Sequence, residues 1–331
     1  MGNKPSIGVI GSGSWATAIV KVLLENFETV NWWVREQEII DSLAEHQKNP
    51  KYLSTIKFDP NKLSVSTKIN EVVEKSEFVL FCIPAAFLDS SLKGLHPYLL
   101  ENKKIISAIK GIIPDQNSIV FDFLASKFGI DRENFVVVSG PSHAEEVAEE
   151  KLTYLTFASE NLTLAQTVSE FFSCHYINTA CSDDIYGTEY APVVKNVIAI
   201  ASGIAVSLGY GDNFQAVLIS NAIQEIDRFM QVVHPIERDI KGSVYLGDLL
   251  VTAYSRFSRN RTFGTMIGKG YSVKFAQYEM EMVAEGFYAA KCIYNINNNR
   301  ADMPICNAVY RILYQNAKPK DEMANLAKLL S

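Results

Sequence analysis

The chain opens with an apolar run, a glycine-rich turn and a helical pattern, and this order limits the folds open to it. Residues 6–10 read SIGVI, the turn GSGSWA (11–16) follows, and the helical pattern continues to LLEN. In such a unit Gly11 permits the tight turn, and Gly13 lets a pyrophosphate approach backbone NH groups at the positive end of the helix. Ala16 is small enough for contact between helix and strand. The pattern predicts a dinucleotide-binding unit rather than a plain βα turn.

The first half of the chain continues this alternation of short strands and helices. Further runs rich in Val, Ile and Phe are typical of strands and lie at residues 29–34, 78–83, 104–109 and 135–140. Helical patterns such as SIVFDFLASKFG separate them, so we expect parallel strands buried on both faces. Two more strand-like runs, at 153–159 and 174–180, are candidates for edge strands. The predicted fold class is α/β, with an N-terminal Rossmann doubly wound, mostly parallel sheet.

The second half differs, because strand signals cease near residue 183. Long apolar helical stretches follow, with Gly and Pro only at their ends. A chain of 331 residues is too long for one ordinary core. We therefore expect a Rossmann dinucleotide-binding domain over residues 1–185 and an all-helical substrate and catalytic domain over residues 186–331.

Composition narrows the class of protein. Hydrophobic residues make up 48% of the chain and charged residues 21%, as in soluble globular enzymes. The net charge of −6 argues against a nucleic-acid partner, which needs a basic surface. The first residues lack the apolar core of a signal peptide, and the five cysteines show no Cys-x-x-Cys spacing, so we expect neither disulfides nor a metal site. These features predict a cytoplasmic protein without stable membrane insertion; they leave the oligomeric state open, a homodimer included.

One lysine interrupts an otherwise apolar helical run. The segment EYAPVVKNVIAIASGIAV, residues 189–206, is typical of a buried helix, yet it carries Lys195. Either this lysine lies near a helix end and reaches water, or it is held in a partly dry site where its pKa falls toward neutrality. In the second case the lysine would be suited to a specific role in a ligand or active site, and the rest of the sequence has to decide between the two. Asn196 and Asp248 are candidates to orient it.

Polar clusters elsewhere favour a phosphate-bearing substrate. AIKGIIPD and VVSGPSHAEEVAEE place Lys110, Gly140 and Ser142 after strands, at the edge where open α/β sheets bind ligands. In the helical half, SRNR (258–261) stands at a predicted helix start, where backbone NH groups and guanidinium groups suit a phosphate. Each feature has a structural alternative, such as Asp248 serving as an N-cap, but a purely structural origin for all of them is improbable.

The end of the second strand bears on the choice of dinucleotide. Arg35 directly follows that strand and Glu36 comes next. An arginine there accommodates the 2′-phosphate of NADP(H), whereas an acidic residue accepts a hydrogen bond from the ribose 2′-hydroxyl of NAD(H). Arg35 therefore favours NADP(H), and Glu36 keeps NAD(H) open. If Arg35 is only a solvated surface charge, it favours neither.

Eight motifs together resemble a known family. In order and approximate spacing they are similar to the NAD(P)-dependent glycerol-3-phosphate dehydrogenases of the bacterial type: GSGSWATA, KGI, SGPSHAEEV, VVKNVIAIASGI, GYGDN, LGDLLVT, SRNRTFG and VAEG. The likeness extends from residue 6 to the C-terminal PICNAVYRILY. It implies reduction of dihydroxyacetone phosphate to sn-glycerol 3-phosphate, the entry to phospholipid synthesis.

The resemblance also implies roles for individual residues. It makes Lys195 the catalytic proton donor and acceptor. It implies a substrate pocket formed by Lys110, Gly140, Ser142, Lys195, Asp248, Ser258, Arg259 and Asn260. Beside Gly11 and Gly13, it implies dinucleotide contacts from Ser14, Trp15, Arg35, Lys110, Ala144, Arg259, Val283 and Glu285.

Some positions depart from the family pattern. Ala16 replaces the usual glycine, Ala85 stands where serine is common, and SNAIQEI (220–226) stands where the family tends to have an Arg-Gly pair. The segment HPIERDIKGSVY before Gly247 is also atypical. These departures bear on cofactor preference and partner surfaces more than on the chemistry.

Two alternative functions remain at this stage. Another two-domain Rossmann dehydrogenase, acting on a hydroxyacid or sugar acid, would also use a lysine from a long helix, but it would not need SRNR and Lys110. A non-catalytic NADP(H)-binding sensor would have no use for the proton donor Lys195.

Overall fold

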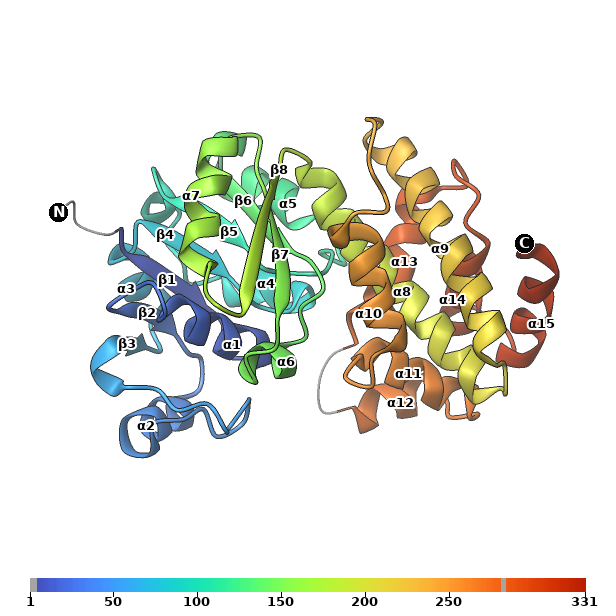
Figure 1. The fold of residues 1–331 in the computed structure, drawn as a ribbon, viewed down its shortest axis with the longest axis horizontal. Helices are drawn as coiled ribbons and strands as arrows, with labels where there is room; N and C mark the ends of the chain where they lie inside the picture. The colour runs from blue at the N-terminus through green and yellow to red at the C-terminus, as the bar shows by residue number, and fades with distance from the viewer. Residues whose placement is uncertain (1–4, 281–283) are drawn as a thin grey trace. The chain divides into compact units, whose positions relative to one another are not determined.

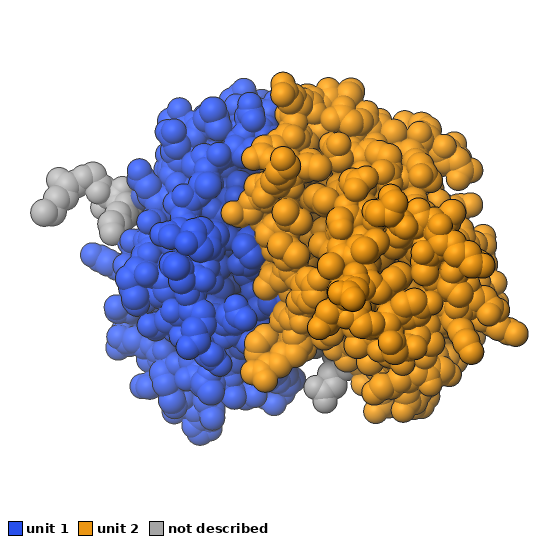
Figure 2. Space-filling view, turned by 45° about the vertical axis from the view of Figure 1, so that its right-hand side comes forward, with its two compact units in different colours: residues 1–109, 120–185 blue, residues 110–119, 186–331 orange. Residues whose placement is uncertain are grey.

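The chain divides into two compact units. The computed structural model describes residues 5–280 and 284–331. Unit 1 comprises Met1–Ile109 and Val120–Ile185, and unit 2 comprises Lys110–Ile119 and Tyr186–Ser331 (Figure 2). The short segment 110–119, which we expected in the first domain, therefore groups with the helical second half.

Unit 1 is built on an eight-stranded sheet with the order β3-β2-β1-β4-β5-β6-β7-β8 (Figure 1). Its strands are β1 (Ile7–Ile10), β2 (Val30–Trp33), β3 (Leu63–Ser66), β4 (Phe78–Phe81), β5 (Lys104–Ser107), β6 (Phe135–Ser139), β7 (Thr153–Ala158) and β8 (Ile177–Ser182). Neighbouring strands are parallel except β6 and β7, which are antiparallel. The predicted α/β class with a mostly parallel sheet is confirmed. The strand order reverses beside β1, the place where doubly wound sheets bind ligands.

Three details of the sheet differ from the prediction. The strand β3 was not predicted, because its four residues alternate apolar side chains with serines and are all only partly buried. The strand β7 lies between β6 and β8, so of the two strands predicted at an edge only β8 occupies one. That edge strand begins at Ile177 instead of residue 174, because Cys174 and Ile177 bridge each other across a tight turn.

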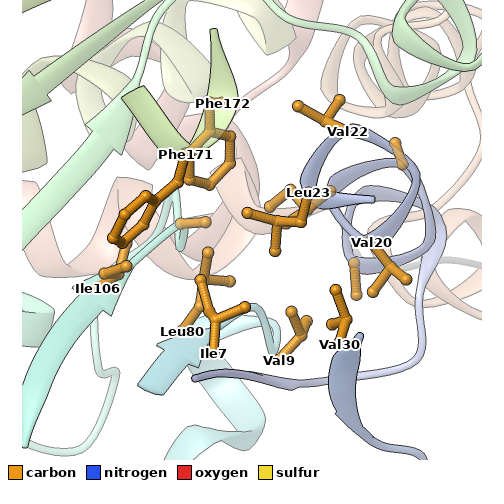
Figure 3. Close-up of a cluster of buried hydrophobic side chains, with 14 of the residues drawn as sticks. Ile7, Val9, Val20, Val22, Leu23, Val30, Leu80, Ile106, Phe171 and Phe172 are labelled. Carbon is orange, nitrogen blue, oxygen red and sulfur yellow. The ribbon is translucent and has the colours of Figure 1, made fainter. Parts of the chain in front are cut away.

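Helices pack against the sheet and bury its apolar faces. They are α1 (Ser14–Leu23), α2 (Gln37–His46), α3 (Ile69–Glu74), α4 (Ala85–Ser91), α5 (Val120–Phe128), α6 (Ala144–Ala148) and α7 (Leu162–Phe172), with short 3₁₀ turns at Pro60–Lys62, Pro97–Leu100 and Arg132–Asn134. Figure 3 shows the cluster that joins the sheet to α1 and α7, where Leu23 and Phe171 lie over the central strands. The ring of Phe171 packs edge-on against Phe27 and Phe78, with centroids 5.0 and 4.9 Å away. This core fixes the first turn of α1 beside the end of β1.

Unit 2 is helical. Its long helices α8 (Ile185–Ser207) and α9 (Asp212–Val233) are followed by a π-turn, η4 (Ser243–Gly247), and by α10 (Asp248–Tyr254), α11 (Arg259–Gly268), α12 (Val273–Glu279), α13 (Glu285–Asn297), α14 (Pro304–Tyr314) and α15 (Pro319–Leu329). Among the described helices, α8 alone is long and apolar enough to cross a membrane, and 89% of its apolar window is buried inside the protein. Such burial is typical of the core helix of a soluble protein.

Glycines let α8 and α11 approach until their backbones touch. A Cβ on Gly203 of α8 would lie 2.1 Å from the carbonyl oxygen of Arg261, and one on Gly264 of α11 would lie 2.1 Å from that of Ile200. Real side chains do not approach a backbone oxygen this closely, so both positions require glycine. The contact fixes the start of α11 relative to the part of α8 that carries Lys195.

Candidate active site

Two lysines in unit 2 share one buried carboxylate. Lys195 projects from α8, and Asp248 is the first residue of α10. Lys110 is the first residue of the segment 110–119, which belongs to unit 2. The Nζ atom of Lys195 lies 2.5 Å from Oδ1 of Asp248, and that of Lys110 lies 3.4 Å from Oδ2. Three segments far apart in sequence therefore meet at one point, with two cations on one anion. The excess positive charge suits an oxygen on which negative charge develops.

The surroundings of Lys195 differ from those of a surface lysine. The residue is 5% exposed and Asp248 is 1% exposed, so this lysine does not reach water at a helix end. Burial lowers the pKa of Lys195 from its ordinary value to about 7; Asp248 opposes this shift and Lys110 adds to it. Near neutral pH the amine can therefore both give and take a proton.

Asn196 fixes Lys110 rather than Lys195. Its side-chain nitrogen donates to the backbone carbonyl of Lys110, 3.1 Å away. We expected Asn196 to orient its neighbour on the helix, but successive residues of a helix point in different directions. Asn196 therefore ties the segment that carries Lys110 to α8, so it is a positioning residue as predicted, but for Lys110.

The backbone around Asp248 has an unusual conformation. Ser243–Gly247 forms a π-turn that runs directly into α10, and the NH of Gly247 lies 3.5 Å from the carbonyl oxygen of Gly242. Single π-turns are rare in proteins, but where they occur they are often found at functional sites. This turn begins in the segment that departs from the family pattern and ends in the LGDLLVT motif, and it sets where α10 begins. It thereby sets the position of the Asp248 carboxylate.

The SRNR segment starts α11, as predicted. Ser258 is its N-cap, and the serine Oγ accepts from the NH of Arg261 at 3.3 Å. Asn260 is buried, and its side-chain oxygen accepts from the NH of Gly286 at 2.9 Å. The predicted pocket residue Asn260 therefore also joins α11 to the start of α13, where Glu285 is the first residue. Arg259 opens α11 and is exposed, so its guanidinium can meet an anion at this helix end.

The start of α13 also packs against α8 beside the lysine. A Cβ on Gly286 would lie 2.5 Å from the carbonyl oxygen of Asn196. The helix α13 therefore approaches α8 next to Lys195. Val283, a predicted dinucleotide contact, lies outside the described residues.

In unit 1, the turn after β1 fits a dinucleotide pyrophosphate. Gly11 has φ +140°, and a Cβ there would lie 2.1 Å from the carbonyl oxygen of Cys82, so only glycine fits. Around Gly13, by contrast, nothing lies within 4 Å of where a Cβ would be, which leaves the backbone open to a ligand. Ser14 begins α1, so the NH groups of its first turn point toward the same opening. The buried Nε1 of Trp15 has no hydrogen-bond partner among the described residues and fits a ligand contact.

A second turn of unit 1, after β6, carries three more predicted residues. Gly140 has φ +124°, and a Cβ there would lie 2.5 Å from the carbonyl oxygen of Tyr154. The hydroxyl of Ser142 donates to the carbonyl of Gly140 at 2.9 Å, and Ala144 begins α6. Local hydrogen bonding therefore holds this turn in shape at the carboxyl end of β6.

Arg35 is paired with its neighbour. Its Nε and one terminal nitrogen donate to Oε1 of Glu36, at 3.1 and 2.7 Å. The hydroxyl of Ser12, in the glycine turn, donates to Oε2 of Glu36 at 2.9 Å. The sequence analysis weighed Arg35 and Glu36 as alternatives and did not predict their pairing.

No cluster typical of a metal centre occurs in the described parts of the chain. Among these residues, no group of three or more His, Cys, Asp or Glu side chains is placed to hold a metal ion.

Comparison with known proteins gives the family. A model of the NAD-dependent glycerol-3-phosphate dehydrogenase N-terminus matches residues 6–165, and one of the C-terminus matches residues 184–324. A glycerol-3-phosphate dehydrogenase [NAD(P)+] from Syntrophomonas wolfei is 34% identical over 329 residues, covering 98% of this chain and 95% of that protein. The chain belongs to the NAD-dependent glycerol-3-phosphate dehydrogenase family.

Other members and solved structures agree with this assignment. The glycerol-3-phosphate dehydrogenase [NAD(P)+] of Syntrophotalea carbinolica is 35% identical, with 97% of each chain covered. A crystal structure of glycerol-3-phosphate dehydrogenase from Coxiella burnetii has a TM-score of 0.88 at 28% identity and covers 98% of this chain and 99% of that one. D-mandelate dehydrogenase has a TM-score of only 0.58 at 16% identity, which shows a related fold and no more. The hydroxyacid alternative is therefore not favoured.

Proposed function

We propose that this protein catalyses the reversible reduction of dihydroxyacetone phosphate to sn-glycerol 3-phosphate with NAD(P)H, and so supplies cytoplasmic glycerophospholipid synthesis. The observation that carries the proposal is the buried Lys195, 2.5 Å from Asp248 and accompanied by Lys110. Family membership supplies the substrate, and the lysine cluster supplies the means to protonate a ketone oxygen.

The proton chemistry follows from the contacts of Lys195. The nicotinamide dinucleotide, when bound, supplies the hydride that adds to the carbonyl carbon. Lys195 Nζ gives its proton to the carbonyl oxygen as negative charge develops there, and the product hydroxyl results. In the reverse direction the neutral amine takes that proton back. Asp248 holds the amine in place, and the charge of Lys110 stabilises the developing oxyanion.

The remaining substrate residues would bind the phosphate and position the ketone. At the start of α11, Arg259 offers a guanidinium group and Asn260 an amide. The backbone NH groups of the first helical turn are further donors for a phosphate. Ser258 keeps this helix end in place as its N-cap. The family resemblance also assigns Gly140 and Ser142 to substrate binding.

For the dinucleotide, the glycine turn of unit 1 is the principal site. Gly11, Gly13, Ser14 and Trp15 would hold the pyrophosphate, with further contacts from Lys110, Ala144, Arg259, Val283 and Glu285. Arg35 would bind the 2′-phosphate, so NADP(H) is favoured and NAD(H) is also accepted. That the protein forms a homodimer stays a prediction. Light scattering of the purified protein, which measures its molar mass in solution, tests it.

A spectrophotometric assay tests this function directly. Dihydroxyacetone phosphate is added to the purified protein with NADH and, in parallel, with NADPH, and the loss of the reduced nicotinamide absorbance is followed. We expect turnover with both cofactors. No turnover with either cofactor, in protein that still binds them, would refute the proposed reaction.

A further inference from the structure

A buried polar contact joins α10 to α8 away from the Lys195–Asp248 pair. Ser202 of α8 is 1% exposed, and its Oγ lies 3.0 Å from the carbonyl oxygen of Ala253, near the end of α10. The last carbonyls of a helix have no partner within that helix, so the serine hydroxyl is a suitable donor for this one. Helix α10 is therefore attached to α8 near both of its ends, through Asp248 and through Ala253 (Figure 1).

The two attachments together set where α10 lies along α8. Lys195 and Ser202 are seven residues apart on α8, close to two turns of about 3.6 residues each, so they share one face of that helix. Asp248 and Ala253 belong to the first and the last turn of α10. Apolar packing has no preferred direction and lets a helix slide, whereas a hydrogen bond holds it in one position.

A third helix holds the Ser202 hydroxyl in place. The side-chain amide oxygen of Gln215, on α9, lies 2.8 Å from Oγ of Ser202, and Gln215 is buried as well. A buried hydroxyl and a buried amide cost free energy unless they are hydrogen-bonded, and a satisfied network favours one arrangement of the helices that contribute to it. The hydroxyl has one hydrogen for two acceptors, so removal of the Gln215 amide would leave that hydrogen for Ala253.

We propose that Ser202 is a positioning residue for the reaction, an inference that rests on the proposed function: its hydroxyl sets the place of α10 along α8 and thereby holds the Asp248 carboxylate against Lys195. Ser202 is buried two turns away from Lys195, so it acts through α10 and not on the substrate. Without the hydroxyl, the end of α10 would keep only apolar packing, and Asp248 could shift away from the amine. A shift of about 1 Å in an active site can cost as much as 10²-fold in rate.

The first test is the kinetics of Ser202→Ala with dihydroxyacetone phosphate. We expect kcat to fall about 5- to 50-fold, because the proton donor is less well placed. The KM for the ketone and the affinity for the dinucleotide should change by less than about twofold, because Ser202 contacts neither ligand. An unchanged kcat would overturn the proposal.

The pH profile of the same variant separates positioning from a general loss of stability. Asp248 raises the pKa of Lys195 against the effect of burial, and Lys110 lowers it, so a more distant Asp248 leaves the pKa of Lys195 lower than in the wild type. The pH at which kcat/KM for dihydroxyacetone phosphate falls should therefore decrease by about half a unit or more. A lower unfolding temperature with an unchanged profile would show a structural role only and would overturn the proposal.

Ser207→Ala is the matched control, because it removes the same hydroxyl from the same helix. The Oγ of Ser207 donates to the carbonyl of Ile204 within α8, at 2.8 Å, so it does not join α8 to another helix. We expect kcat within about twofold of the wild type, since such a bond back to the helix contributes little. Equal losses in Ser202→Ala and Ser207→Ala would contradict a specific role for Ser202.

Gln215→Met tests whether Gln215 acts through Ser202, and it carries the same test if Ser202→Ala does not fold. It should lower kcat in the same way but less, because the hydroxyl still binds Ala253. The double variant should be no slower than Ser202→Ala alone, since both changes act on one network. Losses that multiply in the double variant would refute the action of Gln215 through Ser202.

The titration of Lys195 is also followed without substrate, by NMR of the full chain labelled with ¹⁵N-lysine. The Nζ signal of Lys195 is identified by its absence from Lys195→Ala. We expect a lower pKa of Lys195 in Ser202→Ala than in the wild type and in Ser207→Ala, and the same pKa in all three proteins would overturn the proposal. The two measurements are independent of each other: the expected difference in titration without any turnover of dihydroxyacetone phosphate refutes only the proposed function, whereas turnover with an unchanged titration refutes only the role of Ser202.

Discussion

The dinucleotide turn of unit 1 and the lysine cluster of unit 2 are built in opposite ways. The turn is a continuous stretch of chain that relies on backbone geometry, since Gly11 has a positive φ and Gly13 leaves its NH groups accessible. The cluster relies on side chains from three distant segments, the buried Lys195 and Asp248 and the partly buried Lys110. A site of the first kind can be read from a motif, whereas the second kind depends on helix packing. Changes in helix packing should therefore harm turnover before they harm dinucleotide binding.

The largest expected effect is that of Lys195→Ala. It should lower kcat by about 10²- to 10⁴-fold, the usual contribution of a positioned acid–base group, because alanine has no group that could give a proton to the ketone oxygen. Affinity for the dinucleotide should stay nearly unchanged, since the glycine turn belongs to unit 1. Steady-state kinetics and fluorescence titration measure the two quantities. Near-normal turnover would remove Lys195 from the mechanism.

Removal of the substrate phosphate should have the next largest effect. Dihydroxyacetone should be reduced at least about 10³-fold less efficiently in kcat/KM than its phosphate, equivalent to ~4 kcal/mol. The reason is that binding energy from the non-reacting end holds the carbonyl in position. Arg259→Ala should erase much of this preference. If the wild type reduces both ketones comparably, or if the variant keeps the full preference, the phosphate pocket is misplaced.

A smaller effect is expected where helix packing alone is changed. Gly264→Ala should lower the free energy of unfolding by about 1–3 kcal/mol, because its Cβ would overlap the backbone of α8. It should also lower kcat more than dinucleotide affinity, because the start of α11 moves relative to Lys195. Gly94→Ala, at an exposed glycine with nothing within 4 Å, is the control and should change neither. Equal stability of the two variants would show that the contact between α8 and α11 tolerates a side chain.

Much of the fold could be predicted from local patterns. The buried central strands are continuous Val-, Ile- and Phe-rich runs. The helical half was expected from residue 186, and its first helix, α8, begins at Ile185. Periodicity did not reveal β3, because LSVS is a short, half-buried edge strand with little apolar signal. The grouping of 110–119 with unit 2 also escaped prediction, since it depends on tertiary contacts such as that between Asn196 and Lys110.

In the candidate site, too, features set by local sequence could be predicted, and features set by tertiary contacts could not. The sequence of the glycine turn predicted a pyrophosphate site, and that of SRNR predicted a phosphate site. Both predictions were possible because each motif lies at the start of one helix, so its residues are neighbours in the sequence. Neither the pairing of Arg35 with Glu36 nor the hydrogen bond from the Asn49 side chain to the carbonyl of Ser12 follows from residue spacing. Both depend on how side chains are oriented once the strands and loops are in place, and a single sequence does not specify this.

The pH dependence of the reaction in both directions is the most direct test of the role of Lys195. Its pKa is lowered to about 7, and reduction needs the protonated amine whereas oxidation needs the neutral amine. We therefore predict that kcat/KM for dihydroxyacetone phosphate falls as pH rises through about 7, and that kcat/KM for sn-glycerol 3-phosphate rises over the same range. Both slopes should vanish in the residual activity of Lys195→Ala, whereas an ionisation of the substrate phosphate would persist there. The same pH profile in wild type and variant would contradict the assignment of Lys195 as the proton donor and acceptor.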